Sequence, residues 1–370
     1  MTGPVRMNSK TKHCNIQRGA HNLLKGYAGM KPGQNLLLVG EAGAGSYFEP
    51  GLCFAVASVA EAMGVNTRII MARPVSGAAH FPERVAETMP WADATVFFSR
   101  LGDQVRFFGT PGAGKKVMCY ATTKKHFAAP FATVDYRKMV CIHDLLKNRI
   151  LSSKHYQISA PCGTRLSGEM RHDRGDGDSA TSEFHVDLFP VMIFAPVNCH
   201  RLFGNLVLQG FITSSSTRAY KNSVLSINSA INVIVENSHM VDFEGDVGEI
   251  KAVKRQMERA AEITGGDPYT INSWHTGINP GTFFEGDPHD DLEYWGTAAF
   301  GSPKLTHFHA CGRDPGDVAI HLMNASIAFD KKPLWENGRF VFLDFPEARS
   351  VLSVEEKEVL HLGSLPGIGF

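Results

Sequence analysis

The first part of the chain alternates short apolar runs with segments of helical length. The apolar runs are NLLLV (35–39), TRIIMA (67–72), ATVFF (94–98) and KVMCYA (116–121), and the helical segments include EPGLCFAVASVAEAMG (49–64) and the amphipathic run 135–151. Apolar runs flanked by Gly or Pro and separated by helices are typical of strands in a parallel sheet. We therefore predict a Rossmann-like parallel α/β domain over residues 1–150.

The pattern changes after residue 150, where strands with alternating polar and apolar positions predominate. Examples are HYQISA, NLVLQGFITSSS, KLTHFHACG, DVAIHLMNASIAFD and GRFVFLDF. One helix, from Val247 to Thr264, interrupts them. Strands with a helix packed on them predict a mostly β (α+β) domain over residues 151–370. The 370 residues suffice for two domains, because single cores stop growing below this length.

Composition and charge indicate which kind of partner the protein binds. The chain is 43% hydrophobic and 20% charged, which is typical of a globular protein. Its 37 basic residues balance its 37 acidic ones, so no net charge attracts nucleic acid or an anionic membrane surface. The seven cysteines are scattered and never spaced as CxxC, which argues against a disulfide framework or a zinc ribbon. The amino terminus lacks the apolar core of a signal peptide, so we expect a cytoplasmic protein that acts on a small molecule.

Two glycine-rich segments resemble nucleotide loops. GTPGAGKK (109–116) matches a P-loop as far as Lys115, but Lys116 stands where Ser or Thr must hold magnesium, and a strand-like run follows. We predict a turn between a short helix and a strand, without nucleotide. GEAGAGS (40–46) follows a strand and precedes a helix, but its glycines do not fall as GxGxxG. We interpret it as a tight crossover that is able to touch a ligand. The carboxylates of Asp173, Asp176 and Asp178 lack the turn glycine of a calcium loop, which indicates a polar loop.

Four histidines of the last third are candidate metal ligands. His307 and His309 stand two apart on a predicted strand, so both side chains emerge from the same face. His321 follows in the next strand-like segment after the turn GRDPGD, which predicts a hairpin that brings it to face the pair. His275 lies in SWHTGINPGT, which we read as a Gly/Pro-rich loop. Neutral imidazoles suit iron, zinc, copper or nickel. The alternative is that these histidines are solvated or satisfied within the core.

The segments ENSHMVDFEGD, NSWHTGINPG, LEYWGTAAFG and AIHLMNA resemble those of the 2,5-dihydroxypyridine 5,6-dioxygenases and, more distantly, the metalloaminopeptidases of the aminopeptidase S/T type. The resemblance implies a mononuclear ferrous iron held by a His before a Gly-rich loop and by a His-x-Asp pair on a later strand. His275 matches the first ligand and His321 the second. Met323 stands where the family places Asp, so we take His309 as the third ligand, with His307 as a catalytic neighbour or proton shuttle.

The resulting functional hypothesis is a non-haem Fe(II) dioxygenase that cleaves a small hydroxylated aromatic or N-heteroaromatic ring with dioxygen. Arg100 lies about where the resemblance implies a catalytic His, and Arg100, Arg165 or Arg171 is a candidate partner for an anionic substrate oxygen. Tyr294 and Trp295, read as strand residues, are candidates for a stacking wall. The resemblance implies a homo-oligomer. The alternatives are a zinc-dependent hydrolase related to aminopeptidase S/T and a non-catalytic α/β binding protein.

Overall fold

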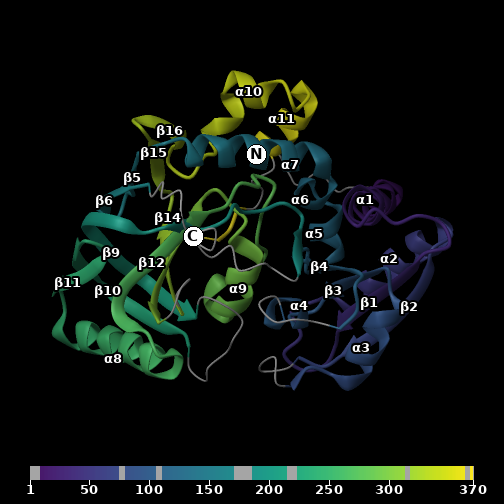
Figure 1. Cartoon of the computed structure of the whole chain (residues 1–370), viewed down its shortest axis with the longest axis horizontal. Coiled ribbons are helices and arrows are strands. Elements are labelled where there is room, and N and C mark those ends of the chain that lie inside the picture. Colours follow the sequence, from purple (N-terminus) through teal and green to yellow (C-terminus); the bar gives the residue numbers. More distant parts are fainter. Residues whose placement is uncertain are drawn as a thin grey trace. The chain divides into compact units, whose positions relative to one another are not determined.

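The computed structural model describes residues 9–74, 80–105, 111–170, 186–214, 223–312, 317–362 and 367–369. The chain divides into two compact units, Met1–Val140 with Glu183–Val191 (unit 1) and Cys141–Ser182 with Met192–Phe370 (unit 2). This division differs from the expected boundary at residue 150 in two respects, because the first stretch of unit 1 ends at Val140 and a later segment returns to that unit. Figure 1 shows the elements of both units along the chain.

Unit 1 is built on a parallel sheet in the order β2-β1-β3-β4-β7. Its strands are β1 (Asn35–Glu41), β2 (Asn66–Ala72), β3 (Ala94–Phe98), β4 (Lys115–Cys119) and β7 (Asp187–Phe189). All four pairings are parallel, and every residue of β3 is buried. Strands covered on both faces need apolar side chains at every position, which explains the unbroken apolar runs of the sequence. The predicted Rossmann-like layer is confirmed.

The described helices of unit 1 are α1 (Ser9–His21), η1 (Asn22–Tyr27), α2 (Pro50–Ala62), α3 (Glu83–Thr88), η3 (Met89–Trp91), α4 (Leu101–Gln104), α5 (Lys124–Ala128), α6 (Pro130–Thr133) and α7 (Tyr136–Leu151), the last of which crosses the boundary between the units. Among them, α2 and α4 contact strands of this sheet. In α2, Leu52, Val56 and Ala60 recur every fourth residue and are fully buried. Residues 111–114 form bends that lead directly into β4, so the predicted turn is confirmed for the described part of 109–116.

His126 is a buried histidine of unit 1. It lies in α5, is 3% exposed, and stacks on Phe131 with 4.6 Å between the ring centroids. Burial disfavours the charged imidazolium and lowers the pKa of His126 from 6.5 to about 4. The folded state therefore keeps this ring neutral at pH values where the unfolded chain binds a proton.

We expect His126 to make the folded state less stable in mild acid. Between pH 6.5 and 4 the unfolded chain takes up a proton that the folded chain does not, so stability falls as the pH falls through this window and levels off below it. The loss between pH 7.5 and 5 should be about 1–2 kcal/mol for this group. Urea unfolding at both pH values measures it, with His126→Leu as the comparison. An equal loss in the wild type and the variant would show that His126 does not contribute.

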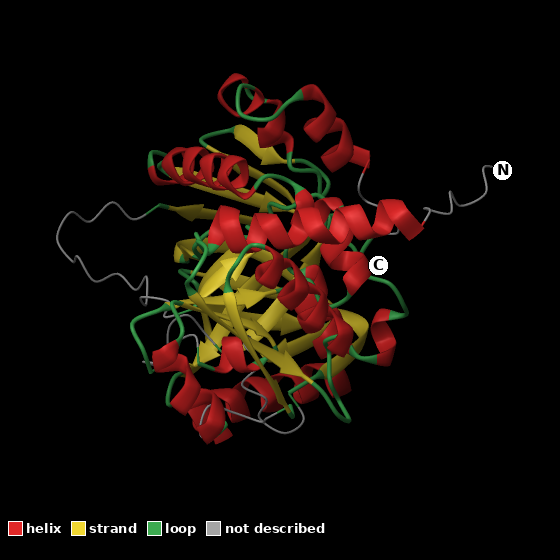
Figure 2. Ribbon diagram, turned by 90° about the vertical axis from the view of Figure 1, so that its right-hand side faces the viewer, coloured by secondary structure: helices red, strands yellow, loops and turns green. Residues whose placement is uncertain are grey.

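Unit 2 is built on an antiparallel sheet in the order β10-β11-β12-β13-β14-β9-β6-β5-β15-β16, with β8 paired to β12. The strands are β5 (His155–Ser159), β6 (Arg165–Glu169), β8 (Val197–Asn198), β9 (His200–Ser214), β10 (Leu225–Glu236), β11 (His239–Glu244), β12 (Asp267–Thr276), β13 (Leu305–Gly312), β14 (Val318–Met323), β15 (Ser326–Phe329) and β16 (Lys332–Trp335). Because the long strand β9 pairs with both β14 and β10, the strands β9 to β14 close into a ring (Figures 1 and 2). The predicted mostly β unit is confirmed.

The two faces of strand β12 have different surroundings. On β12, Trp274 points to one face and packs against Tyr156 of β5 and Phe329 of β15, with ring centroids 5.3 and 6.1 Å away. Its neighbour His275 points to the opposite face, because successive side chains of a strand alternate. Trp274 is fully buried and anchors β12 in the core. The packing of Trp274 thereby fixes the direction of His275.

The helices of unit 2 are α8 (Val247–Thr264), η4 (Pro288–Asp290), α9 (Leu292–Ala299), η5 (Val341–Asp344), α10 (Pro346–Arg349) and α11 (Val354–Leu362). The helix predicted over 247–264 is confirmed, with the Asp246 side chain accepting from the backbone N–H of Glu249 and Gly265 ending it at φ 73°. In the described part of the chain, no helix combines the length and the apolar character that a membrane span needs.

Tyr294 and Trp295 were expected in a strand, and this expectation is wrong, because residues 292–299 form helix α9. The Asp291 carboxylate accepts from the backbone N–H of Tyr294 and caps the helix. Trp295, Ala298 and Ala299 are buried at helical spacing. A cap and a three-to-four-residue period favour a helix over a strand at this length.

Candidate metal centre

Strands β12 and β13 bring three histidines together on one face of the unit 2 sheet. His275 of β12 lies directly opposite His307 of β13, and Ser273 lies opposite His309. His307 and His309 are two residues apart, so both point to the face of His275. The expectation that His307 and His309 share a face of one strand is confirmed. His275 lies within a strand rather than in the expected loop, because its backbone pairs with β13.

Strand β14 adds a fourth histidine, His321, beside this group. The hairpin predicted between the two histidine segments is present, and it places His321 directly opposite His307. His275, His307 and His321 therefore form a row across three neighbouring strands, with His309 beside it. The register of an antiparallel pairing puts directly opposite side chains on the same face.

The group with the shortest mutual distances is His275, His307 and His309. The ring centroids are 4.2 Å apart for His275 and His307, 4.9 Å for His275 and His309, and 5.0 Å for His307 and His309. One ring nitrogen from each lies within 4.8 Å of the others. The Nε2 atoms of His275 and His309 are 2.9 Å apart.

The surroundings of this group bury and orient its imidazoles. His307 and His309 are 7% and 6% exposed, and His275 is half-buried. Burial, together with the imidazoles of His275, His309 and His321, lowers the pKa of His307 well below its usual value. The Nδ1 atom of His275 lies 3.2 Å from the carbonyl oxygen of Phe194. A carbonyl only accepts, so Nδ1 carries the proton and Nε2 presents its lone pair toward His309.

These features fit a metal ion. Neutral imidazoles are the usual nitrogen ligands of first-row metals, and a ligating histidine commonly donates its other N–H to a carbonyl, as His275 does to Phe194. Two nitrogens bound to one ion at about 2.1 Å lie roughly 3–3.5 Å apart, close to the observed separation of the two Nε2 atoms. Within the described residues, Nδ1 of His307 is buried and has no hydrogen-bond partner. The three-histidine group can hold a metal.

His321 lies beside this group in an apolar environment. Its ring centroid is 6.4 Å from that of His307, 4.7 Å from Phe211 and 5.9 Å from Trp295. Burial lowers the pKa of His321 to about 4, so it is neutral at physiological pH. His321 is not a member of the closest group, in which His307 takes the place that we expected for His321. Which of the two completes a metal site stays a prediction.

Met323 does not supply a ligand in place of the carboxylate of the dioxygenase pattern. It packs against the apolar cluster that contains Phe211, Trp295 and Leu305. Among the described residues, the histidine group includes no Asp or Glu. The donor set that the structure offers is therefore entirely nitrogen.

The remaining candidates have different environments. Tyr294 of α9 is half-buried and packs edge-on against Phe284 at 5.5 Å, and Trp295 is fully buried in the core. Arg165 is exposed on strand β6 rather than on a loop, because its backbone pairs with both β5 and β9. Arg171 and the acidic run Asp173, Asp176 and Asp178 lie outside the described residues.

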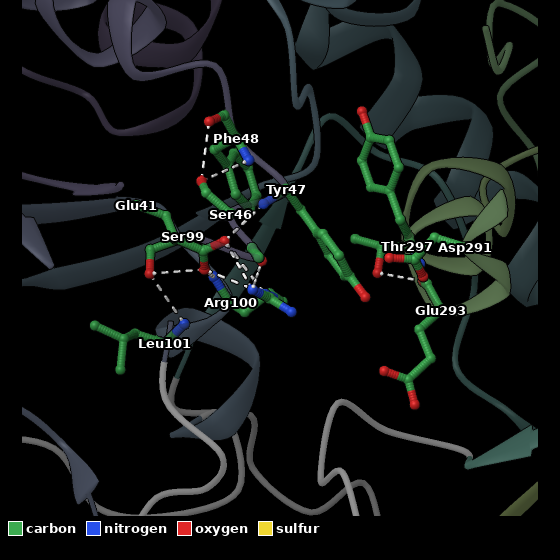
Figure 3. Close-up of polar contacts among 12 residues, drawn as sticks. Glu41, Ser46, Tyr47, Phe48, Ser99, Arg100, Leu101, Asp291, Glu293 and Thr297 are labelled. Atoms are coloured by element: carbon green, nitrogen blue, oxygen red, sulfur yellow. Dashed lines mark hydrogen bonds and ion pairs between the residues drawn. The ribbon is translucent and has the colours of Figure 1, made fainter. Parts of the chain in front are cut away.

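Arg100 belongs to unit 1, where it follows strand β3. Its guanidinium forms an ion pair with Glu41 at 3.1 Å and lies over the ring of Tyr47 at 3.7 Å (Figure 3). Sequence reasoning missed Glu41, although an acidic residue two positions after the apolar run NLLLV is a recognisable signal. It also missed the carbonyl of Phe194, which no residue type could reveal.

The fold and the histidine group define a two-unit chain in which a parallel α/β unit accompanies an antiparallel unit with a candidate metal centre. No family model matches this sequence, and no curated protein matches it either. The structure is similar to that of the 2,5-dihydroxypyridine dioxygenase from Pseudomonas putida KT2440, with a TM-score of 0.56, 15% identity, and coverage of 94% of this chain and 100% of that one. AmpT from Thermus thermophilus matches with a TM-score of 0.47, 12% identity, and coverage of 89% and 99%. The similarity to the dioxygenase confirms the fold that the sequence resemblance implied.

Proposed function

We propose that this protein is a metal-dependent enzyme, a non-haem Fe(II) dioxygenase that cleaves a small hydroxylated aromatic or N-heteroaromatic ring. The observation that carries the proposal is the group of His275, His307 and His309, which has one ring nitrogen from each within 4.8 Å of the others on a rigid sheet face. The proposed substrate class follows the structural neighbour, whose name gives 2,5-dihydroxypyridine. Iron, when bound there, would supply the redox chemistry and the open positions for substrate and dioxygen.

The aromatic residues around the group favour an enzyme that acts on a ring. The histidine group contains no carboxylate among the described residues, and zinc also accepts three histidines in catalytic sites, so the donor set alone does not decide between iron and zinc. The neighbours of the group are aromatic: Phe194 lies 6.4 Å from His275, and Phe300 lies 6.2 Å from His307. An apolar border suits a planar ring and keeps water from the reacting atoms.

The chain's own groups have distinct proposed tasks. The Phe194 carbonyl holds the Nδ1 proton of His275 and thereby aims Nε2. His321 and Phe211 close the row beyond His307 and exclude water. Catalytic roles for Arg100 and Tyr294 stay part of the proposal, as do iron rather than zinc, the aromatic substrate and a homo-oligomeric assembly.

The test is metal analysis and oxygen uptake on protein purified without oxygen. We expect about one iron per chain and consumption of dioxygen with 2,5-dihydroxypyridine as the probe, both lost in His309→Ala because one of three ligands is removed. His289→Ala is the matched control, since the His289 side chain is 71% exposed. Zinc with turnover that needs no oxygen would support the hydrolase instead. A protein that binds neither metal would contradict both.

A further inference from the structure

The carboxyl ends of β1 and β3 form the point at which the unit 1 sheet changes direction. In the order β2-β1-β3-β4-β7, the chain passes from β1 outward to β2 and then crosses back to β3 on the other side of β1. Where the connections that follow two neighbouring strands lead in opposite directions, a crevice forms outside the carboxyl ends of those strands. Ligands of open α/β sheets bind in this crevice. Glu41 is the last residue of β1, and Ser99 and Arg100 directly follow β3.

A buried ion pair occupies this position. The Glu41 side chain is 0% exposed, and its carboxylate accepts from the backbone N–H groups of Tyr47 at 2.8 Å and Arg100 at 3.0 Å. It also accepts from Nε of Arg100 at 3.2 Å, and Nη2 of Arg100 lies 3.1 Å away. Figure 3 shows the carboxylate between these donors. Burying an unpaired carboxylate is costly, so Arg100 and Glu41 hold each other in one geometry.

The loop GEAGAGS completes the clamp. The second nitrogen of the guanidinium, Nη2, also donates to the carbonyl of Gly45, and the Tyr47 ring covers one face. Gly43 and Gly45 have φ values of 110° and 76°, which allow the loop to turn back toward Arg100. Clamping of this kind removes the rotational freedom of a long side chain before any ligand arrives.

One edge of the guanidinium is left for a ligand. Nε and Nη2 are used by Glu41 and Gly45, whereas Nη1 makes no hydrogen bond to the described part of the chain. The Arg100 side chain is 16% exposed, so it is not closed off from a ligand. A single nitrogen cannot offer the two-pronged contact that carboxylate and phosphate prefer. The carboxylate of Glu41 also cancels the positive charge, which weakens attraction for multiply charged anions.

We infer that unit 1 contains a small-molecule site at the ends of β1 and β3, in which Arg100 donates through Nη1 to one oxygen of the ligand, such as the hydroxyl oxygen of a ring. Glu41 and Tyr47 are positioning residues that act through Arg100. Every group that holds Arg100 in this geometry belongs to unit 1, so the assembly of this site does not require the metal proposed for unit 2.

The test compares 3-hydroxypyridine with pyridine, which lacks the oxygen, by titration calorimetry on the full chain. We expect the wild type to bind 3-hydroxypyridine about tenfold more tightly, the effect of one charge-assisted hydrogen bond. Arg100→Met should abolish the preference. The same result is expected in the His309→Ala background, so a failed metal centre leaves this test valid.

A double-mutant cycle tests the positioning role. Glu41→Gln should reduce the preference in the presence of Arg100 and have no further effect on it in Arg100→Met. Tyr47→Leu should act in the same direction and serves as the second variant if Glu41→Gln fails to fold, which the urea unfolding midpoint reports. The inference is overturned if the wild type shows no preference for the oxygen, if Arg100→Met retains it, or if inorganic phosphate binds more tightly than 3-hydroxypyridine.

Discussion

Replacing His307 by alanine is expected to lower the affinity for the metal by at least about 100-fold, since even loss of a group that only orients a ligand costs roughly 10–100-fold. The structure places His307 centrally, 4.2 Å from His275 and 5.0 Å from His309 between ring centroids. The effect should equal that of His309→Ala. Metal content after dialysis against a competing chelator, measured by mass spectrometry, gives the comparison.

His321→Ala is the matched variant, because it removes the remaining imidazole of the row. We expect it to keep its metal, since the His321 ring is 6.4 Å from that of His307 and is enclosed by Phe211 and Trp295. Met323→Ala should likewise leave the metal content unchanged, because Met323 packs in an apolar cluster. A His321→Ala protein without metal, beside a His307→Ala protein that retains it, would establish His275, His309 and His321 as the ligands.

Trp295→Ala is expected to lower the free energy of unfolding by about 3–5 kcal/mol, as large aromatic truncations in cores do. Trp295 is fully buried, stacks edge-on with Phe211 at 5.3 Å, and donates from Nε1 to the carbonyl of Ile368 at 2.5 Å. The truncation opens a cavity and leaves that carbonyl without its donor. Urea unfolding followed by circular dichroism measures the change.

Two further variants test whether the loss of stability in Trp295→Ala comes from the burial of this side chain. Trp295→Phe should cost less than Trp295→Ala, because it keeps most of the apolar volume and loses the hydrogen bond. Ile263→Ala, on the 56% exposed side chain of Ile263 in α8, should change stability by about 0.5 kcal/mol or less. If Trp295→Ala were as mild as Ile263→Ala, α9 would not be held by this residue.

Much of the fold was predictable because local rules and tertiary packing agree. The run ATVFF is a strand over the same residues, 94–98, and the helix 247–264 matches its predicted ends, where the structure shows Asp246 and Gly265 as caps. The strand conformation predicted for Tyr294 and Trp295 was wrong because aromatic residues suggest a strand, whereas the Asp291 cap and the buried positions 295, 298 and 299 favour a helix. The return of 187–189 to the first sheet pairs β7 with β4, a contact between residues far apart in sequence.

The candidate site was likewise predictable only in part. The two-residue spacing of His307 and His309 determines that both point to one face, because the strand repeat is two residues. Spacing also predicted the hairpin that places His321 opposite His307. It did not predict that His275 would lie opposite His307, since that register depends on the bulged pairing of β12 with β13.

By itself, the sequence determined the two kinds of sheet, the helix ends and the histidines that are able to converge, because periodicity, caps and strand alternation act over a few residues. The tertiary structure alone decided which three imidazoles lie closest, that the Phe194 carbonyl orients His275, and that Glu41 clamps Arg100. These features are contacts between segments separated by tens of residues. Their geometry follows from strand register and core packing, which no local pattern encodes.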